Sequence, residues 1–279
     1  MKIGLISSWV DMVVLFRFLS KYDFQYEIVY DDLGWPWSDK PLEFVLERAR
    51  KAIDILVEKG VDKIIVPPVV EVALHQDKKY AAHILPLRMA YVSNECLPAS
   101  PVGKIGFAGE YVDLVSKNLF EAHVQSYQPN ETQLGRVSDL AAKKPGHVRQ
   151  FSFRWHEISM RKFYLTKLSF KSQIVHHAMK ADWRYFKDAL VDTIIPTSYG
   201  FFAYEAILGK FLNNRKQRFH RLASVEKQFA SLIQPATHSK YSVAIHYTWT
   251  LDHLTREKKR MWMLQRGKEI SVDTKQISL

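Results

Sequence analysis

The feature that most constrains the fold is a short apolar run that follows a helix end. Residues 64–66 (Ile-Ile-Val) are β-branched and come soon after Gly60, a typical helix terminator. An uninterrupted run of this kind predicts a strand that is buried on both faces of a parallel sheet. Parallel sheets bind ligands just beyond the carboxyl ends of their strands. Residues 67–70 (Pro-Pro-Val-Val) occupy that position and offer no acid, base, nucleophile or metal ligand.

The elements around this run alternate between strand and helix. Two more strands are expected at residues 2–6 and 25–30. Helices are expected at about 13–21, at about 39–59, where apolar residues follow the 3.6-residue period, and at about 71–79. Strands and helices that alternate with short loops predict βαβ units and hence a parallel sheet.

A second set of elements repeats the first. Residues 104–109 (Lys-Ile-Gly-Phe-Ala-Gly) resemble residues 2–6 (Lys-Ile-Gly-Leu-Ile), and residues 191–199 repeat the Val-Asp pair, buried strand and loop of 61–70. This repetition predicts an α/β protein with two similar halves. The other expected elements are helices at about 111–122, 201–212, 224–232 and 251–265, a strand at 241–247 and a terminal edge strand at 269–277.

Composition supports a folded protein of one large or two small domains. The chain has 279 residues, of which 47% are hydrophobic. Its single cysteine, Cys96, excludes an internal disulfide and a zinc site built from several cysteines, and it is consistent with a reducing cytoplasm. Asp11 and Arg17 interrupt the apolar start, and no run reaches the roughly 18 apolar residues of a membrane span. We therefore expect a soluble, cytoplasmic protein.

Five short motifs occur along the chain in a characteristic order. They are residues 3–8 (Ile-Gly-Leu-Ile-Ser-Ser), 36–40 (Pro-Trp-Ser-Asp-Lys), 60–66 (Gly-Val-Asp-Lys-Ile-Ile-Val), 104–106 (Lys-Ile-Gly) and 192–195 (Asp-Thr-Ile-Ile). In order and spacing they resemble the glutamate racemases of the aspartate/glutamate racemase superfamily. The resemblance implies an α/β fold of two pseudo-symmetric domains, each a mainly parallel sheet flanked by helices, with an interdomain cleft. We expect a first domain of residues 1–100 plus about 236–279, and a second of 101–235 that includes a basic aromatic helical section at 145–187.

The resemblance also implies a chemistry, which this chain does not retain. In that family two cysteine thiols face each other across the cleft and act without a cofactor. One removes the α-proton and the other returns a proton on the opposite face, because a single base would return it to the side it came from. The first Cys-Asn-Thr motif falls on residues 68–70 (Pro-Val-Val), and the second, Cys-Thr-His, falls on 197–199 (Thr-Ser-Tyr). Cys96, 28 residues after Pro68, replaces neither thiol. We therefore predict a pseudoenzyme that uses no cofactor.

The polar residues at the positions that match the racemase motifs have two interpretations. The hydroxyl groups could bind a small polar or anionic ligand at helix N-termini, or they could simply cap helices. A new nucleophile such as Ser8 would need a base, and no Ser-His-Asp arrangement is visible. No histidine spacing favours a metal site, since adjacent His176 and His177 would diverge on a helix. The predicted remnant of the cleft comprises Ser7, Ser8, Trp37, Ser38, Pro68, Val69, Val70, Thr197, Ser198 and Tyr199.

Positive charge is concentrated in one section of the chain. The net charge is +11, and residues 143–187 hold eleven Lys and Arg against Glu157 and Asp182. Lysine and arginine alternate there with aromatic residues. This pattern is compatible with stacking on single-stranded nucleic acid, with docking of a protein partner, or with a solvated basic face. The candidate partner-binding residues are Arg149, Arg154, Trp155, Arg161, Lys162, Tyr164, Lys167 and Lys171.

These observations lead to one main hypothesis and two alternatives. The main hypothesis is a racemase-like pseudoenzyme that serves as a scaffold or adaptor subunit in a larger assembly, such as a bacterial secretion machine, with a protein partner that is acidic. The first alternative is a protein, enzyme or sensor, that binds an amino acid or other carboxylate in a remodelled cleft. The second is nucleic-acid binding through the basic aromatic section.

Overall fold

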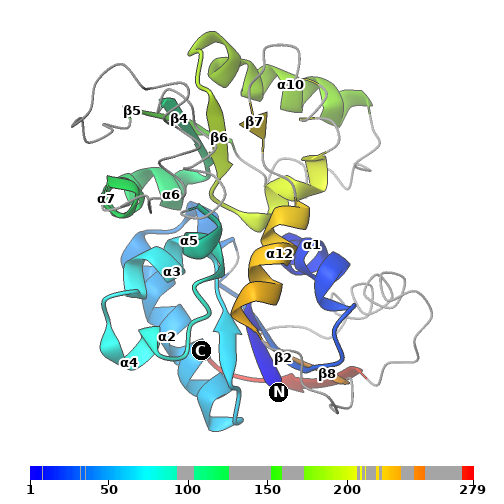
Figure 1. The fold of residues 1–279 in the computed structure, drawn as a ribbon. Coiled ribbons are helices and arrows are strands. Elements are labelled where there is room, and N and C mark those ends of the chain that lie inside the picture. Colours follow the sequence, from blue (N-terminus) through cyan, green and yellow to red (C-terminus); the bar gives the residue numbers. More distant parts are fainter. Residues whose placement is uncertain are drawn as a thin grey trace. The chain divides into compact units, whose positions relative to one another are not determined.

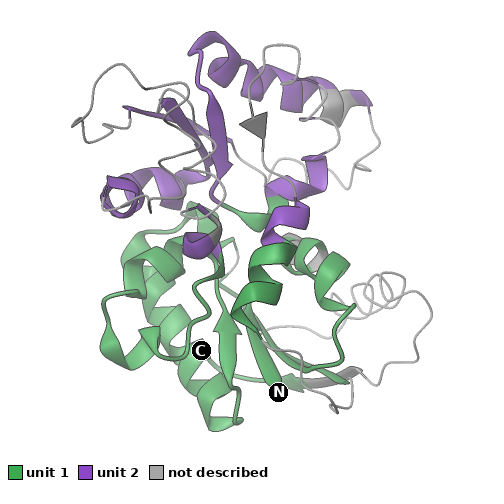
Figure 2. Cartoon of the chain, in the orientation of Figure 1, with its two compact units in different colours: residues 1–87, 198–200, 226–279 green, residues 88–197, 201–225 purple. Residues whose placement is uncertain are grey.

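The computed structural model describes two compact units, each built as an α/β structure (Figure 2). The first comprises Met1–Leu87, Ser198–Gly200 and Glu226–Leu279, and the second Arg88–Thr197 and Phe201–Val225. The units divide earlier in the chain than the boundaries at 100/101 and 235/236 that the sequence suggested. The structure describes residues 1–7, 9–31, 33–34, 36–92, 104–125, 152–158, 173–205, 208, 211, 218–219, 222–233, 242–248 and 272–279.

The first unit contains a five-stranded sheet in the order β3-β1-β2-β8-β9, and all four strand pairs are parallel (Figure 1). β1 and β3 are buried along nearly their whole length because helices cover both faces. The strands are β1 (Lys2–Ile6), β2 (Gln25–Tyr30), β3 (Lys63–Ile65), β8 (Ser242–Tyr247) and β9 (Val272–Gln276).

The helices of the first unit follow from the winding of this sheet. The connection from β1 to β2 runs in one direction across the sheet and the connection from β2 to β3 runs back, so right-handed crossovers place α1 and α2 on opposite faces. α2 packs on β1 and β2 through an apolar stripe that includes Val45, Ala49 and Leu56. The helical segments are α1 (Trp9–Leu19), η1 (Trp37–Asp39), α2 (Leu42–Glu58), α3 (Pro68–Leu74), α4 (Lys78–Ala81) and α12 (Leu222–Leu232), of which α12 begins in the second unit.

The second unit contains a four-stranded parallel sheet in the order β5-β4-β6-β7. Its core lies between this sheet and α10, where Met179, Trp183 and Phe186 are fully buried. The strands are β4 (Lys104–Gly109), β5 (Ser152–Glu157), β6 (Thr193–Pro196) and β7 (Arg218–Phe219). The helical segments are α5 (Leu87–Tyr91), α6 (Tyr111–Val115), α7 (Lys117–Gln125), α10 (Gln173–Asp188) and η3 (Tyr199–Tyr204).

The predicted repeat is present in the backbone register of the two sheets. Gly4 of β1 lies opposite Ile64 of β3, and Gly106 of β4 lies opposite Ile194 of β6. Before each of β3 and β6, an aspartate N–H donates to the carbonyl of the lysine that opens the neighbouring strand, at 2.9 Å in both units. Both glycines are required by packing, since a Cβ on Gly4 or Gly106 would lie within about 3 Å of neighbouring side chains. The two-half prediction is therefore confirmed at the level of fold.

Several expected elements differ in the structure. The helix expected at 71–79 begins at Pro68 and is divided into α3 and α4, and the helix expected at 111–122 is divided into α6 and α7. The section at 145–187, expected to be helical, contains the strand β5 because its alternating side chains fit a strand that pairs with β4. The described start of the helix expected at 201–212 is the 3-10 segment η3. The helix expected at 251–265 lies outside the described residues.

No helix in the described part of the chain is long and apolar enough to cross a membrane.

Candidate functional site

The winding of each sheet identifies one place where a ligand site is expected. In doubly wound sheets, ligands bind beyond the carboxyl ends of the two neighbouring strands from which the connections run in opposite directions. In the first unit the connections from β1 and β2 run in opposite directions, and the predicted site residues follow β1 and β3, at Ser7 and at Pro67–Pro68. In the second unit these strands are β4 and β6, which end at Glu110 and Thr197.

At the end of β3 the chain turns directly into α3. Pro67 precedes the helix and Pro68 is its first residue, a position that suits proline because that N–H has no partner within the helix. Pro68, Val69 and Val70 are buried in the first unit. Val69 and Val70 carry aliphatic side chains, and proline lacks both an ionisable group and an N–H. Pro68, Val69 and Val70 therefore present no group that could transfer a proton.

At the end of β1, Ser7 has a buried hydroxyl oxygen with no hydrogen-bond partner among the described residues. Ser8, the next residue of the predicted cleft, lies outside the described residues. Cys96 also lies outside them.

Trp37 and Ser38 lie in η1, beside a buried carboxylate at the end of β2. Asp31 accepts hydrogen bonds from the indole Nε1 of Trp37 at 2.8 Å, from the Gly34 N–H at 3.0 Å and from the Thr248 hydroxyl at 2.9 Å. Its strongest partner is Arg48 of α2, whose Nε and Nη2 both donate to it, the second at 2.6 Å. Burial alone would raise the pKa of Asp31, but these hydrogen bonds, led by that of Arg48, lower it below its usual value. The Trp37 N–H is thus committed to the protein interior.

Ser198 is also held by a buried carboxylate of the first unit. Its hydroxyl donates to Oδ1 of Asp11 at 2.9 Å, and the N–H of Gly200 donates to the same oxygen. Asp11 lies in α1 and is 5% exposed. Tyr199, between these two residues, is buried. Asp11 therefore serves as a cap for the start of η3, which favours the capping reading for the Ser198 hydroxyl.

In the second unit, Thr197 is tied to the loop after β4. Its N–H donates to the carbonyl of Ala108 at 2.8 Å, and its hydroxyl lies 2.6 Å from Oδ2 of Asp113. The same Asp113 oxygen accepts from the N–H of Glu110 at 2.9 Å. Thr197 and Asp113 are both almost fully buried. The group at the end of β6 is therefore a hydroxyl whose hydrogen bond is already made within the unit.

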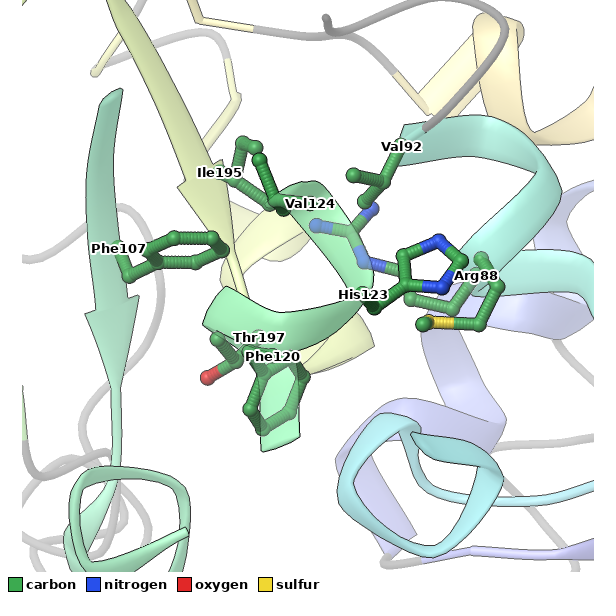
Figure 3. A pocket seen from close by; sticks show the side chains of 9 residues that line it. Arg88, Val92, Phe107, Phe120, His123, Val124, Ile195 and Thr197 are labelled. Atoms are coloured by element: carbon green, nitrogen blue, oxygen red, sulfur yellow. The ribbon is translucent and has the colours of Figure 1, made fainter. Parts of the chain in front are cut away.

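A small cavity lies beside this strand end, over β4 and β6 (Figure 3). It has a volume of about 10 Å³, close to the least that holds one water molecule. Arg88 of α5 lines it with its guanidinium and is 1% exposed. The other lining residues are Met89, Val92, Phe107, Phe120, His123, Val124, Ile195 and Thr197.

The basic aromatic section is described only in part. Trp155 of β5 packs within the second unit, since its ring stacks on Phe107 at 4.4 Å and its Nε1 donates to Glu121 at 2.6 Å. Arg154 points outward and is exposed. Trp155 is therefore already committed to the core of the unit. The other candidate partner-binding residues, Arg149, Arg161, Lys162, Tyr164, Lys167 and Lys171, lie outside the described residues.

Comparison with solved structures decides the fold. The chain matches a glutamate racemase from Bacillus anthracis (isoform RacE1) with a TM-score of 0.71 and 12% identity, over 99% of this chain and 97% of that one. It matches the Thermus thermophilus glutamate racemase, solved with β-chloro-D-alanine, with a TM-score of 0.69 and 13% identity over 100% and 97%. The chain has the fold of the glutamate racemases.

A third structure with this fold, the glutamate racemase from Francisella tularensis in complex with D-glutamate, matches with a TM-score of 0.68 and 12% identity, over 99% of this chain and 97% of that one. At the level of sequence, no family model and no curated protein matches the chain. Among the described residues, no three His, Cys, Asp or Glu side chains gather as the ligands of a metal ion.

Three buried charged residues of these sites were not singled out in the sequence, namely Asp31, Asp113 and Arg88. Asp11 was noted only as an interruption of an apolar segment. That interruption was a usable signal, because a charged residue inside an apolar segment is costly unless it has a structural partner. Arg88, between Leu87 and Met89, gives the same signal.

Proposed function

We propose that this chain is a catalytically inactive protein of racemase fold that acts as a scaffold or adaptor in a larger protein assembly. One observation carries the first half of the proposal. The carboxyl ends of β3 and β6, where the racemases to which the sequence bears a resemblance have thiols, hold Pro68 and Thr197.

The chemistry of racemisation explains why these two residues matter. Inversion at an α-carbon needs one group that removes a proton and a second that supplies one to the other face. Proline can do neither. A threonine hydroxyl is a very weak acid, and that of Thr197 is bound to the Asp113 carboxylate at 2.6 Å. The neighbouring Val69 and Val70 offer no hydrogen bond to a substrate.

The second half of the proposal, protein binding, is supported by charge. The chain has a net charge of +11, and exposed Lys180 and Arg184 lie one turn apart on α10. An acidic protein surface fits such a face. The single cysteine agrees with a cytoplasmic location for this assembly. We propose no cofactor and no nucleic-acid partner for this role.

The first half is tested by proton exchange at the α-carbon. Purified protein is incubated in D₂O with L- or D-glutamate, and with L- or D-aspartate, and the α-proton signal is followed by NMR. A glutamate racemase serves as the positive control. Exchange requires only one functional base, so this assay detects even half of the racemase chemistry. Because neither Pro68 nor Thr197 can act as that base, we expect no exchange above the buffer rate. Loss of any α-proton signal that depends on the protein would overturn the proposal of inactivity.

The second half is tested by capture of partners from the native source at moderate salt. We expect one stoichiometric protein that is retained by the wild type and lost when Lys180 and Arg184 are both changed to Glu. The matched control changes exposed Lys78 and Lys117 to Glu, which alters the net charge equally. Equal loss in both variants, or no stoichiometric partner, would contradict the scaffold role.

A further inference from the structure

The outer face of α10, a helix of the second unit (Figure 1), carries two exposed cations. Met179, Trp183 and Phe186 fix the inner face of this helix against the second sheet. On the outer face Lys180 and Arg184 are exposed and lie one turn apart. Within the described part of the chain, neither has an ion pair or a hydrogen bond. Both cations can therefore bind an acidic group without breaking an existing contact.

We propose that this face of α10 binds an acidic amphipathic helix of a protein partner. The inference rests on the proposed scaffold role, and it adds the structural element and the charge of the partner segment. Three features of the second unit carry it, namely the spacing of the exposed side chains on α10, the aromatic contact beside them and the number of cations.

The spacing of the exposed side chains fits a second helix. Four of them stand at positions i, i+3, i+4 and i+7 and so share one face of α10: His177, Lys180, Ala181 and Arg184. Four residues in this arrangement enclose a hole that accepts one side chain of a facing helix. The small Ala181 lets the partner approach closely, and Lys180 and Arg184 place donors beside it. A glutamate or aspartate on the partner helix fits this hole.

An aromatic contact with β5 lies beside these residues. The ring of Tyr185 stacks on that of His156 in β5, with ring centroids 4.6 Å apart, and Tyr185 is still 38% exposed. Exposed Arg154 lies on the same side of β5 as His156, because side chains two residues apart in a strand share a face. Tyrosine and arginine are typical anchors of protein interfaces. Ala181 and Tyr185 therefore suit the apolar side of an amphipathic helix, and the cations suit its acidic side.

The number of cations favours a protein over nucleic acid or a membrane. Proteins that hold DNA by its phosphates make roughly six to ten such contacts, and recognition of an anionic membrane takes clusters of about four to eight Lys or Arg. Among the described residues of α10 and β5, the exposed Lys and Arg are Lys180, Arg184 and Arg154. Exposed Asp188 ends the helix and would repel a continuous polyanion. A short protein segment with a few carboxylates matches this pattern.

The direct test places a photo-cross-linking residue beside the proposed contact. In the full chain p-benzoylphenylalanine replaces Tyr185, which keeps an aromatic ring there, and mass spectrometry identifies the cross-linked segment of the partner. We expect one segment of negative net charge with carboxylates three or four residues apart. The matched control carries the same residue in place of Tyr111 of α6, which is 46% exposed, and should not cross-link that segment.

The outcomes separate this inference from the scaffold role. A cross-link from position 185 to a neutral or basic segment, or to nucleic acid, overturns the inference. A partner that is still retained but does not cross-link there also overturns it and leaves the scaffold role standing. The absence of any partner removes both.

A synthetic peptide of the cross-linked segment then tests the charge and the helix. Arg184→Glu should weaken the binding of this peptide about tenfold, because it sets like charges against each other. Lys117→Glu on α7 is the matched control and should change the affinity less than about twofold. A peptide in which the facing acidic residue is changed to Lys should regain affinity for the Arg184→Glu protein. Equal binding to wild type and Arg184→Glu, or no gain of helical circular dichroism on binding, contradicts the proposal.

Discussion

Leu190 holds a backbone conformation that suits glycine. It follows α10 with φ of 52°, and it is 62% exposed. The equivalent position after α2 is Gly60, with φ of 72°. A side chain with a Cβ loses roughly 1 kcal/mol or more in this left-handed region. Both units therefore end this helix with a residue in the left-handed conformation. Only the first unit has glycine, the residue that favours this conformation, at that position.

We predict that Leu190→Gly raises the free energy of unfolding by about 1 kcal/mol, because the strain is removed and little buried surface is lost. Gly60→Ala is the matched control and should lower it by a similar amount, about 1 kcal/mol. A Cβ on Gly60 would have no atom within 4 Å, so this loss is conformational. Urea unfolding measures both. A destabilised Leu190→Gly protein would show that the exposed leucine makes contacts that outweigh its strain.

Asp31 is predicted to be the most sensitive carboxylate of the first unit. Asp31→Asn removes the charge that faces Arg48 and should cost about 3 kcal/mol, since it leaves a partly buried guanidinium without its counter-charge. Glu47→Gln, which breaks the exposed pair with Lys51, should change stability little. Equal effects of the two substitutions would contradict the buried role of Asp31.

The pH dependence gives Asp31 a second signature. Because its pKa is lowered in the folded state, its stabilising effect is complete above the unfolded pKa of about 3.9 and is lost as the pH falls through the folded value. The difference in stability between wild type and Asp31→Asn should therefore be constant near neutral pH and shrink below about pH 4. Unfolding curves collected from pH 7 to pH 3 measure this difference.

At the scale of elements, three strands of the first sheet are joined by a chain of polar side chains. Nε2 of His246 in β8 lies 2.6 Å from Glu27 in β2, and Lys2 in β1 lies 2.8 Å from the other oxygen of Glu27. Burial lowers the pKa of His246, and the hydrogen bond to Glu27 opposes this only in part. Burial would raise the pKa of Glu27, but the bonds from His246 and Lys2 lower it. The contact is therefore a hydrogen bond from neutral histidine to a carboxylate at neutral pH.

A measurable acid sensitivity follows from this arrangement. Because the folded pKa of His246 is below its unfolded value of about 6.5, the unfolded state takes up a proton first as the pH falls. Stability should therefore decrease from about pH 7 down to the folded pKa. His246→Gln keeps an N–H donor for Glu27 but does not titrate, so its stability should be flatter in this range. Parallel slopes for the two proteins between pH 7.5 and 5.5 would contradict the assignment.

The elements also show which parts of the structure the sequence could predict. The β1 and β4 strands and the turns before β3 and β6 were predicted because their signals are local, as in the Val-Asp pairs at 61–62 and 191–192. The segment that forms β5 was expected to be helical because its charged residues were given the most weight. Phe153 and Trp155 are two residues apart, and this period of two is typical of a strand. η3 depends on the bond from Gly200 to Asp11, a contact between residues far apart in the chain. No local pattern contains such a contact.

At the scale of the whole molecule, the repeat explains why the fold could be predicted and the function of the site could not. Each half closes its own parallel sheet with the same register, so the fold depends on buried strands that survive many substitutions. A catalytic site depends instead on a few positioned polar groups. Here two of the hydroxyl groups after β6 are already paired internally, Thr197 with Asp113 and Ser198 with Asp11. The sequence signals that specify the fold are therefore distinct from those that would specify a chemistry.

This distinction predicts that two introduced thiols alone will not produce racemisation. The double variant Pro68→Cys, Thr197→Cys should fold, yet it should show no α-proton exchange with glutamate or aspartate in D₂O. Val69 and Val70 still provide no hydrogen bond to a substrate, and the Trp37 N–H is still held by Asp31. Without such contacts the α-carbon is not positioned beside a thiolate, and much of the rate advantage of a bound substrate is lost. Adding Val69→Asn and Val70→Thr supplies polar groups that can hydrogen-bond a substrate and is the matched comparison. Exchange by the double variant itself would contradict this prediction and show that two thiols are sufficient.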